Sequence, residues 1–305
     1  MMTDWMIEVD NFSKHYGDFV AVDDISFQVD KGEIFGLLGP NGAGKTSTLE
    51  CLEGLRPSSS GRLRVAGVDP TAEPHKLRNL IGVQLQSAGL PATITADEVM
   101  ELFCAYHDIA PRFDLLDRLG LQDKRRVEFQ EMSTGLQRRL ALTLAVAHEP
   151  PVLFLDEPTA GLDVSSRVEL HNLMREHREK GMTIILATHD MAEAEELSDR
   201  VAILLNGKVV AIDSPMAITA TGADLTKVSV NTRKGVLLSN HHPIPAVNQY
   251  LVKDQYAIYF SVDIGSTVAA LIDVVQDEGD MLIDLRVERP SLEDRFLELT
   301  NGGRK

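Results

Sequence analysis

The sequence predicts an α/β domain built on a parallel sheet, followed by a small second α/β domain. Three observations support this prediction. Short, nearly continuous apolar runs alternate with helical stretches, a pattern typical of strands that are buried on both faces of a parallel sheet. One of these runs leads into a Gly-rich loop and then directly into a helix. From about residue 225 onward, strand-like segments of mixed polarity surround a single helical segment.

The first part of the chain contains the alternating strands and helices. Two strand-like segments, "MIEVDNFSKHY" and "DDISFQV", are separated by the turn signal Gly17-Asp18. The apolar run "EIFGLLG" then ends at Gly39 and is followed by the Gly-rich loop and the helix "TSTLECLEGL". Further buried strands are expected at "PVLFLDEP" and "MTIILATHD", with the helix "VSSRVELHNLMREHREK" between them. This alternation indicates an α/β domain.

Between about 90 and 150 the pattern is wholly helical, which predicts a helical subdomain inserted into the α/β core. "TADEVMELFCAYH" begins with a capping box, Thr95 to Glu98. "RFDLLDRLG" is a short helix closed by Gly120, and "TGLQRRLALTLAVAHE" is a longer one with Leu136, Leu140 and Leu144 on one face. We therefore expect a first domain over 1–224 and a second domain over 225–305.

The second domain is expected to contain the strands "KVSVNT", "QYAIYFSV" and "MLIDLRVERP", with the helix "GSTVAALIDVVQDEG". The tail "PSLEDRFLELT" predicts an amphipathic helix that Ser291 caps, with Leu292, Phe296 and Leu299 on one face. This helix either docks on its own domain or takes part in regulation or dimer contact.

Composition excludes several classes of function. The 305 residues are 44% hydrophobic and 25% charged, as in ordinary globular proteins, and their net charge of −16 argues against a nucleic-acid partner. No apolar run approaches the roughly 18–20 residues that span a bilayer, and the acidic start "MMTDWMIEVD" does not resemble a signal peptide. We expect a cytoplasmic chain in which Cys51 and Cys104 are buried thiols.

The segment "GPNGAGKT" fits the phosphate-binding pattern G-x-x-x-x-G-K-[ST], with Gly39, Gly44, Lys45 and Thr46 at the defining positions. Glycines let successive backbone N–H groups face one phosphate chain at the start of a helix, whose dipole also favours anions. Lys45 can reach the β- and γ-phosphates, and the Thr46 hydroxyl can ligate Mg²⁺. A strand before the loop and a helix after it give the motif its expected context.

The second half of such a site should be an apolar strand that ends in an acid, and "VLFLDEP" supplies it. Asp156 at the end of the strand can hold Mg²⁺ through water. Glu157 follows immediately and can orient or deprotonate the attacking water. The sequence thus predicts nucleotide hydrolysis.

With these motifs, the first 225 or so residues resemble the ATP-binding subunit of an ATP-binding cassette (ABC) transporter. Further motifs of that family follow in its order, and the joint order makes the resemblance strong. Tyr16 matches the aromatic residue that stacks on adenine. The Walker A loop corresponds to Gly39, Pro40, Asn41, Gly42, Ala43, Gly44, Lys45 and Thr46, with Ser47 next to it, and the remaining matches are Gln86 of the Q-loop, Asp163 of the D-loop and the switch histidine His189.

The resemblance implies a P-loop NTPase (RecA-like) core with the antiparallel β and helical subdomains of an ABC cassette, and ATP and Mg²⁺ as cofactors. It also implies catalytic roles for Glu157, His189 and Gln86. Gln86 would sense Mg²⁺ or the attacking water, and Gln84 is a competing candidate for this position. His189 can donate to the γ-phosphate and hold Glu157 and the water in line.

The segment "MSTGLQRRL" (132–140) departs from the family's signature L-S-G-G-Q. Thr134 replaces the first Gly, and Leu136 stands where Gln is usual. The chemistry needs a hydroxyl and free backbone N–H groups at a helix start, aimed at the γ-phosphate of a facing subunit, and Ser133 and Gly135 retain these. The S-T-G form resembles that of the ABC-2-type exporter group, as does the C-terminal tail.

The resemblance implies an ATP-hydrolysing subunit that powers a membrane exporter. Its partners would be a separately encoded transmembrane permease and a second copy of itself or a homologous cassette, with no nucleic acid. The chain would lie at the inner face of the membrane through the permease. A soluble ABC ATPase is the alternative, although such proteins usually carry two cassettes or a long coiled-coil insertion. A regulatory module without turnover is disfavoured because Glu157 and His189 are both present.

Overall fold

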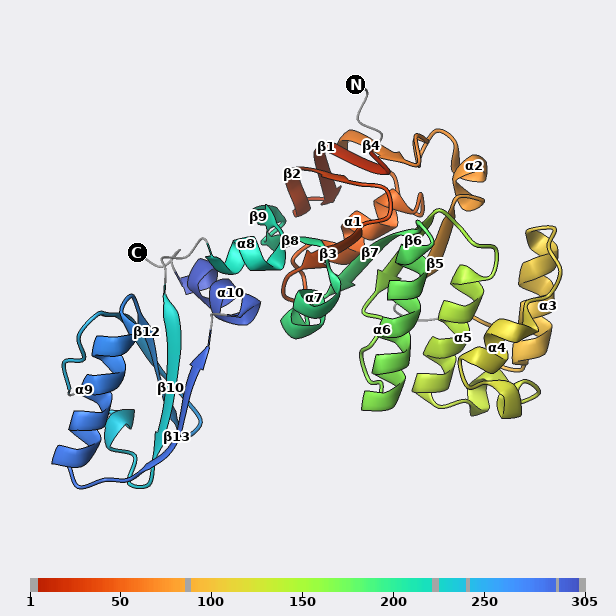
Figure 1. The fold of residues 1–305 in the computed structure, drawn as a ribbon. Helices are drawn as coiled ribbons and strands as arrows, with labels where there is room; N and C mark the ends of the chain where they lie inside the picture. Colours follow the sequence, from red (N-terminus) through yellow and green to blue (C-terminus); the bar gives the residue numbers. More distant parts are fainter. Residues whose placement is uncertain (1–4, 86–88, 221–224, 240–241, 289–290, 302–305) are drawn as a thin grey trace. The chain divides into compact units, whose positions relative to one another are not determined.

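The computed structural model describes residues 5–85, 89–220, 225–239, 242–288 and 291–301. The chain forms two compact units, Met1–Ser214 and Pro215–Lys305 (Figure 1). This division precedes the expected boundary between 224 and 225. Helix α8 (Pro215–Ala220) contacts α10 (Leu292–Asn301), and it therefore belongs to the second unit.

A six-stranded sheet forms the centre of the first unit. Its outer strand β9 runs antiparallel to β8, and all other neighbours are parallel. Strands β3, β6 and β7 are buried at every position, as their continuous apolar runs predict. The spatial order is β5 (Ile81–Gln84), β6 (Val152–Asp156), β7 (Thr183–Thr188), β3 (Ile34–Leu38), β8 (Arg200–Leu205) and β9 (Lys208–Asp213).

The two faces of this sheet support two separate cores, because successive side chains of a strand point to opposite faces. On β6, Val152 and Phe154 join one core, whereas Leu153 and Leu155 join the other. The first core is completed by α1 (Lys45–Leu52) and by a three-stranded antiparallel sheet in the order β2 (Phe19–Val29), β1 (Ile7–Tyr16) and β4 (Ser60–Val65). The short helix α2 (Pro74–Arg78) adds Leu77 to it.

Helices complete the second core, on the other face of the sheet. The capping box predicted for α3 is present, since the Thr95 hydroxyl accepts from Glu98 N and the Glu98 carboxylate accepts from Thr95 N. Cys104 lies in this core and Cys51 in the other, and both are buried free thiols as predicted. The helices are α3 (Ala96–Tyr106), α4 (Phe113–Arg118), α5 (Thr134–Val146), α6 (Val164–Glu179) and α7 (Met191–Leu197), with 3₁₀ turns at Gln122–Lys124 and Phe129–Glu131.

The second unit is a four-stranded antiparallel sheet with α9 (Ile264–Asp277) packed on one face. Its strand order is β11 (Val247–Lys253), β12 (Tyr256–Ser261), β10 (Thr226–Thr232) and β13 (Leu282–Glu288), and a 3₁₀ turn lies at Val236–Leu238. Strand β11 was not predicted. The tail helix α10 is present, and Ser291 caps it by accepting from Asp294 N.

None of the helices in the described ranges is long and apolar enough to cross a bilayer.

Candidate functional site

The loop between β3 and α1 has the backbone of a phosphate-binding loop. Gly39 (φ +155°) and Gly44 (φ +106°) adopt conformations that side-chain-bearing residues rarely reach. A Cβ on Gly39 would lie 2.4 Å from Leu204 O, and one on Gly44 would lie 2.6 Å from Ala21 O. Glycine is therefore required at both ends, and the curled loop leads directly into α1.

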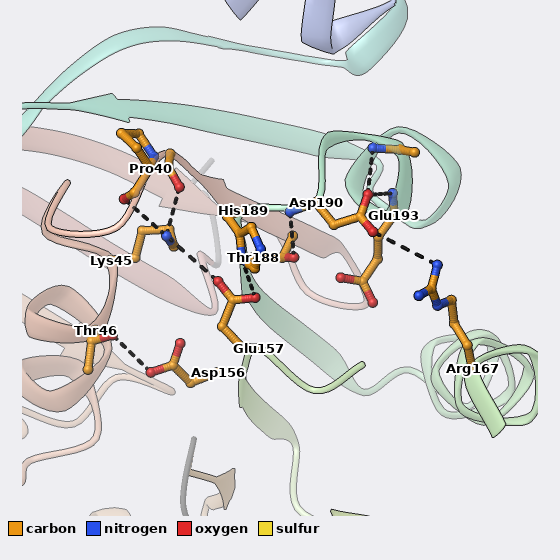
Figure 2. A network of polar contacts seen from close by, with 12 residues as sticks. Pro40, Lys45, Thr46, Asp156, Glu157, Arg167, Thr188, His189, Asp190 and Glu193 are labelled. Atoms are coloured by element: carbon orange, nitrogen blue, oxygen red, sulfur yellow. Dashed lines mark hydrogen bonds and ion pairs between the residues drawn. The ribbon is translucent and has the colours of Figure 1, made fainter. Parts of the chain in front are cut away.

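Lys45, the first residue of α1, points back into the loop (Figure 2). Its ammonium donates to Gly39 O at 2.7 Å and to Pro40 O at 3.3 Å. It also lies 3.8 Å from Oε1 of Glu157. Burial lowers the pKa of Lys45, while the nearby Glu157 and Asp156 oppose that shift. A cation is thus held at the place where phosphate oxygens would enter the loop.

The carboxyl end of β6 faces this loop. The Thr46 hydroxyl donates to Oδ2 of Asp156 at 3.0 Å, which joins α1 to the last residue of the strand. Burial raises the pKa of Asp156, with the Thr46 hydrogen bond acting in the opposite direction. Two oxygen donors, a hydroxyl and a carboxylate, therefore lie side by side at the end of the sheet.

Glu157 and His189 come together beside these groups, although they follow different strands. Nδ1 of His189 lies 2.8 Å from Oε2 of Glu157 (Figure 2). Glu157 N donates to Ala187 O at 2.9 Å, and its own carbonyl accepts from Arg138. Glu157 is 8% exposed, whereas the His189 side chain is 57% exposed. The acid is fixed and shielded, and the imidazole is open to an incoming group.

A cavity of 330 Å³ lies over this arrangement. Tyr16 lines it from the end of β1, and its hydroxyl donates to Ser47 Oγ at 3.3 Å. Phe19 on the next strand also lines the cavity and is 62% exposed. The remaining lining residues are Ala21, Asn41, Gly42, Ala43, Gly44, Lys45, Thr46, Ser47, Asp156 and Glu157.

Two contributors to this site were missed by the sequence analysis. Phe19 is an exposed aromatic residue beside the turn at Gly17-Asp18, close to Tyr16 in sequence, and that pairing is a signal that could have found it. Arg138 donates to the Glu157 carbonyl from the first turns of α5. An arginine in a run of basic and apolar residues carries no such signal, because the contact depends on the tertiary fold.

The residues at the end of β6 fit a magnesium ion. Mg²⁺ in nucleotide sites prefers oxygen ligands, is held by one or two protein groups, and completes its shell with water and phosphate oxygens. The adjacent oxygens of Thr46 and Asp156 suit such an ion, and burial of Asp156 favours a positive partner. No cluster of three or more His, Cys, Asp or Glu side chains able to hold a metal occurs among the described residues, and this kind of site needs none.

The signature residues lie outside the cavity. Ser133 is the N-cap of α5, where its hydroxyl accepts from Leu136 N at 3.4 Å, and it is exposed. Leu136 packs against the helical core, and the neighbouring Gln137 donates to Phe129 O at 2.8 Å. Leucine at that position is thus explained by burial. The structure does not bring Ser133 or Gly135 together with Lys45 in the cavity of this chain.

Asp163 is likewise outside the cavity, at the start of α6. Its carboxylate accepts from Ser166 N at 2.9 Å and from the Ser166 hydroxyl at 2.7 Å. These bonds hold the pKa of Asp163 well below its usual range. Gln86 lies outside the described residues, and the competing Gln84 is a buried residue at the end of β5, opposite Leu155.

A glycine-bounded phosphate loop between a strand and a helix, with an acidic strand end facing it, defines a P-loop nucleoside triphosphatase. Residues 22–160 match the family model described as "ABC transporter". The chain is 34% identical to "Daunorubicin resistance ATP-binding protein DrrA3" of Streptomyces coeruleorubidus, over 100% of this chain and 98% of that protein. It belongs to the ATP-binding proteins of the ABC transporter family, and it is an ABC-type ATPase.

Two further similarities agree with this assignment. "Nod factor export ATP-binding protein I" of Paraburkholderia xenovorans (strain LB400) is 33% identical, over 98% of each chain. A solved structure described as "Structure of ATP binding subunit of ABC transporter" superposes with a TM-score of 0.66 at 29% identity, over 70% of this chain and 91% of the other. The expected ABC cassette fold is therefore confirmed.

Proposed function

We propose that this chain powers a membrane exporter by binding Mg²⁺·ATP, dimerising and hydrolysing the nucleotide, together with a separate transmembrane permease. The observation that carries the proposal is the contact between Glu157 and His189 at 2.8 Å, at the strand end that faces the phosphate loop. An acid, an imidazole and a lysine thus meet where a γ-phosphate would lie.

Each residue has a role that follows from its position. Lys45 and the loop N–H groups bind the phosphates, while Thr46 and Asp156 hold Mg²⁺, which would neutralise the developing charge. Glu157 accepts the proton of the attacking water, and His189 keeps that carboxylate in place and donates to the γ-phosphate. Tyr16 and Phe19 offer aromatic faces at the mouth of the cavity, where adenine would stack.

A second copy completes the site in this proposal. Ser133 caps a helix whose first residues, the exposed Thr134 and the half-buried Gly135, do not line the cavity of their own chain. Exposed N–H groups at a helix N-terminus suit an anion. The γ-phosphate bound by one chain is therefore contacted by Ser133 and Gly135 of the other, and Asp163 lies at the same dimer contact.

The permease is assigned to an apolar groove of 570 Å³ on the first unit. Helix α3 contributes the large apolar side chain of Leu102 and the aromatic side chain of Tyr106, which are 64% and 63% exposed. The groove also includes Leu85 and Gly89, which flank the segment containing Gln86. A permease bound there would hold the chain at the inner face of the membrane. The relatives are named as resistance and export proteins, which favours export as the direction of transport.

The hydrolysis proposal is tested by phosphate release from ATP with and without Mg²⁺. We expect turnover that requires Mg²⁺ and that Lys45→Ala abolishes. Turnover unaffected by removal of Mg²⁺ would exclude the assigned roles of Thr46 and Asp156.

The permease proposal is tested by co-purification with a candidate permease, a protein from a neighbouring reading frame that carries several apolar segments of ~20 residues. Leu102→Asp should abolish co-purification and leave ATP binding intact. Leu55→Asp is the matched control, because Leu55 is 57% exposed and lies outside the groove. Equal retention of both variants would reject the groove as the docking site.

A further inference from the structure

The second unit ends its sheet with an exposed strand. In the order β11-β12-β10-β13, strand β13 pairs with β10 on one side, and no described strand pairs with its other side (Figure 1). Every second residue of β13 therefore directs its backbone N–H and C=O groups outward. An unpaired edge of this kind is a template for another strand unless it is covered or distorted.

The apolar side chains of β13 are unusually exposed for a sheet. Ile283 is 59% exposed and Val287 is 44% exposed, and Val287 lies on the same face as Leu285, the face that carries α9. Met281, just before the strand, is 54% exposed. This edge therefore combines free backbone groups with apolar surface.

Two charged residues alternate with these apolar ones. Asp284 and Arg286 lie on the opposite face, where Arg286 Nε donates to Asp284 Oδ2 at 2.7 Å and Tyr256 Oη donates to the same oxygen at 2.8 Å. Their side chains remain 30% and 56% exposed. The charges are thus held in fixed positions along the edge.

This sequence is self-complementary in the antiparallel register that overlaps the whole of β13. An axis through Val287 also pairs opposite charges, Arg286 with Glu288, but it overlaps only the last three residues of the strand. Only outward-facing residues can exchange hydrogen bonds, so a two-fold axis relating two copies of the strand must pass through a residue. An axis through Asp284 would place that carboxylate opposite itself, and an axis through Arg286 would do the same with the guanidinium. Like charges directly opposite each other destabilise a strand pair.

An axis through Leu285 gives the opposite result. It places Asp284 of each copy opposite Arg286 of the other, and Leu285 opposite Leu285 of the other copy. Both charge pairs then match, and an apolar pair lies between them. We propose that β13 pairs with β13 of a second copy about a two-fold axis at Leu285, which joins the two second units into one continuous sheet.

The two edges of the sheet differ in how well they suit such pairing. The ladder of β13 with β10 is regular from Asp284 to Glu288, and its register shift falls beside Ile283 at the start of the strand. At the other edge, β11 has a register shift between Val247 and Gln249 and ends in Lys253, and irregularity and lysine both discourage edge pairing. The regular, self-complementary edge is therefore the one that dimerises.

This contact needs no nucleotide, because all of its residues lie in the second unit. It therefore goes beyond the proposed ATP-driven dimer of the first unit. As a consequence, two chains stay associated while their cassettes separate after hydrolysis. The next association of the two cassettes is then an intramolecular event.

The test uses the full chain without nucleotide, measured by sedimentation velocity. Asp284→Arg places arginine opposite Arg286, and Arg286→Asp places aspartate opposite Asp284. We expect each variant to raise the dissociation constant at least about tenfold relative to wild type. Asp273→Arg, on the exposed side of α9, is the matched control and should dimerise as wild type does.

Mixing the two variants gives the sharper result. In the mixed dimer, arginine at 284 faces aspartate at 286 of the other chain, and the remaining native pair is also of opposite charge. Dimers should reappear on mixing, which misfolded variants could not achieve. A monomeric wild type, variants that dimerise normally, or variants that fail to complement each other would each overturn the proposal. ATP hydrolysis is measured separately, so these outcomes are distinct from a failure of the proposed function.

Discussion

Glu157 has a backbone conformation that side-chain-bearing residues seldom adopt, with φ at +50°. Such a conformation costs of order 1 kcal/mol or more and persists only where the surroundings hold it. Here the Glu157 N–H is bonded to Ala187 O, and the carbonyl accepts from Arg138. The strained turn directs the carboxylate away from β6 and toward Lys45 and His189. We interpret this as positioning of the proposed base before ATP arrives.

The first prediction concerns this carboxylate. Glu157→Gln keeps the shape of the side chain and removes its basicity, so hydrolysis should fall by roughly 10²–10⁴-fold while ATP affinity changes little. Single-turnover phosphate release and nucleotide titration measure the two quantities. Glu179→Gln, on the exposed surface of α6, is the control. Turnover of Glu157→Gln within about threefold of wild type would remove Glu157 as the base.

A second prediction at this scale concerns pH. Burial lowers the pKa of His148 to about 4, and the His107 ring stacks on it at 4.0 Å. The unfolded chain, with an ordinary histidine pKa near 6.5, binds this proton first as the pH falls. Stability should therefore decrease from pH 7 toward pH 4, by at most about 2 kcal/mol at pH 5 from this residue.

His148→Gln should show a flatter dependence of unfolding free energy on pH between these values. Chemical denaturation at pH 7 and pH 5 measures it, with the wild type as reference. An unchanged slope would show that His148 does not carry the pH effect.

At the scale of elements, the strands that end at the site were predictable and the edges of the molecule were less so. Strands β3, β6 and β7 are buried on both faces, so their apolar runs stand out in the sequence. Strand β11 reads "VNQYLVK", and no residue in it is fully buried because it lies at a sheet edge. Its pattern is therefore too weak to separate from a loop.

The site shows the same contrast. Motifs with fixed spacing, such as the loop that ends at Lys45, were predicted in place, and Glu157 and His189 meet as their proposed roles require. The assigned roles themselves stay predictions. Phe19, three residues from Tyr16, could have been found from that pairing of aromatic residues. Arg138 reaches the site through the tertiary fold, which sequence spacing does not reveal.

A prediction at the scale of elements concerns the contribution of the N-terminal cap of α3 to stability. Its capping box satisfies two backbone donors, so Thr95→Ala should lower the free energy of unfolding by about 1 kcal/mol. Denaturant titration measures the loss. Thr93→Ala is the matched control, since Thr93 is exposed and lies before the cap. Equal stability of the two variants would show that the cap contributes nothing.

At the scale of the whole molecule, the two units have separate hydrophobic cores. All residues that line the nucleotide cavity lie in the first unit. A variant that ends at Ser214 should therefore fold and bind ATP as the full chain does, while it loses dimerisation in the absence of nucleotide. Circular dichroism, nucleotide titration and sedimentation measure these properties. A folded variant that no longer binds ATP would contradict the division of roles.

We propose that one chain contains only part of each hydrolytic site, because the Ser133 helix start lies outside the cavity of its own chain. Two chains related by a two-fold axis would then form two composite sites. Lys45→Ala disables the phosphate loop and Ser133→Arg blocks the signature, so each variant should be inactive alone. In a mixed dimer, one site carries both defects and the other carries none.

The measurement is ATP hydrolysis by the two variants, alone and mixed, in single-turnover and steady-state experiments. We expect no activity from either variant alone and recovery of activity on mixing. Single-turnover data reveal recovery even if strict coupling between the sites suppresses steady-state turnover. An active Ser133→Arg protein, or two inactive variants that never complement each other in single-turnover hydrolysis, would contradict the composite site.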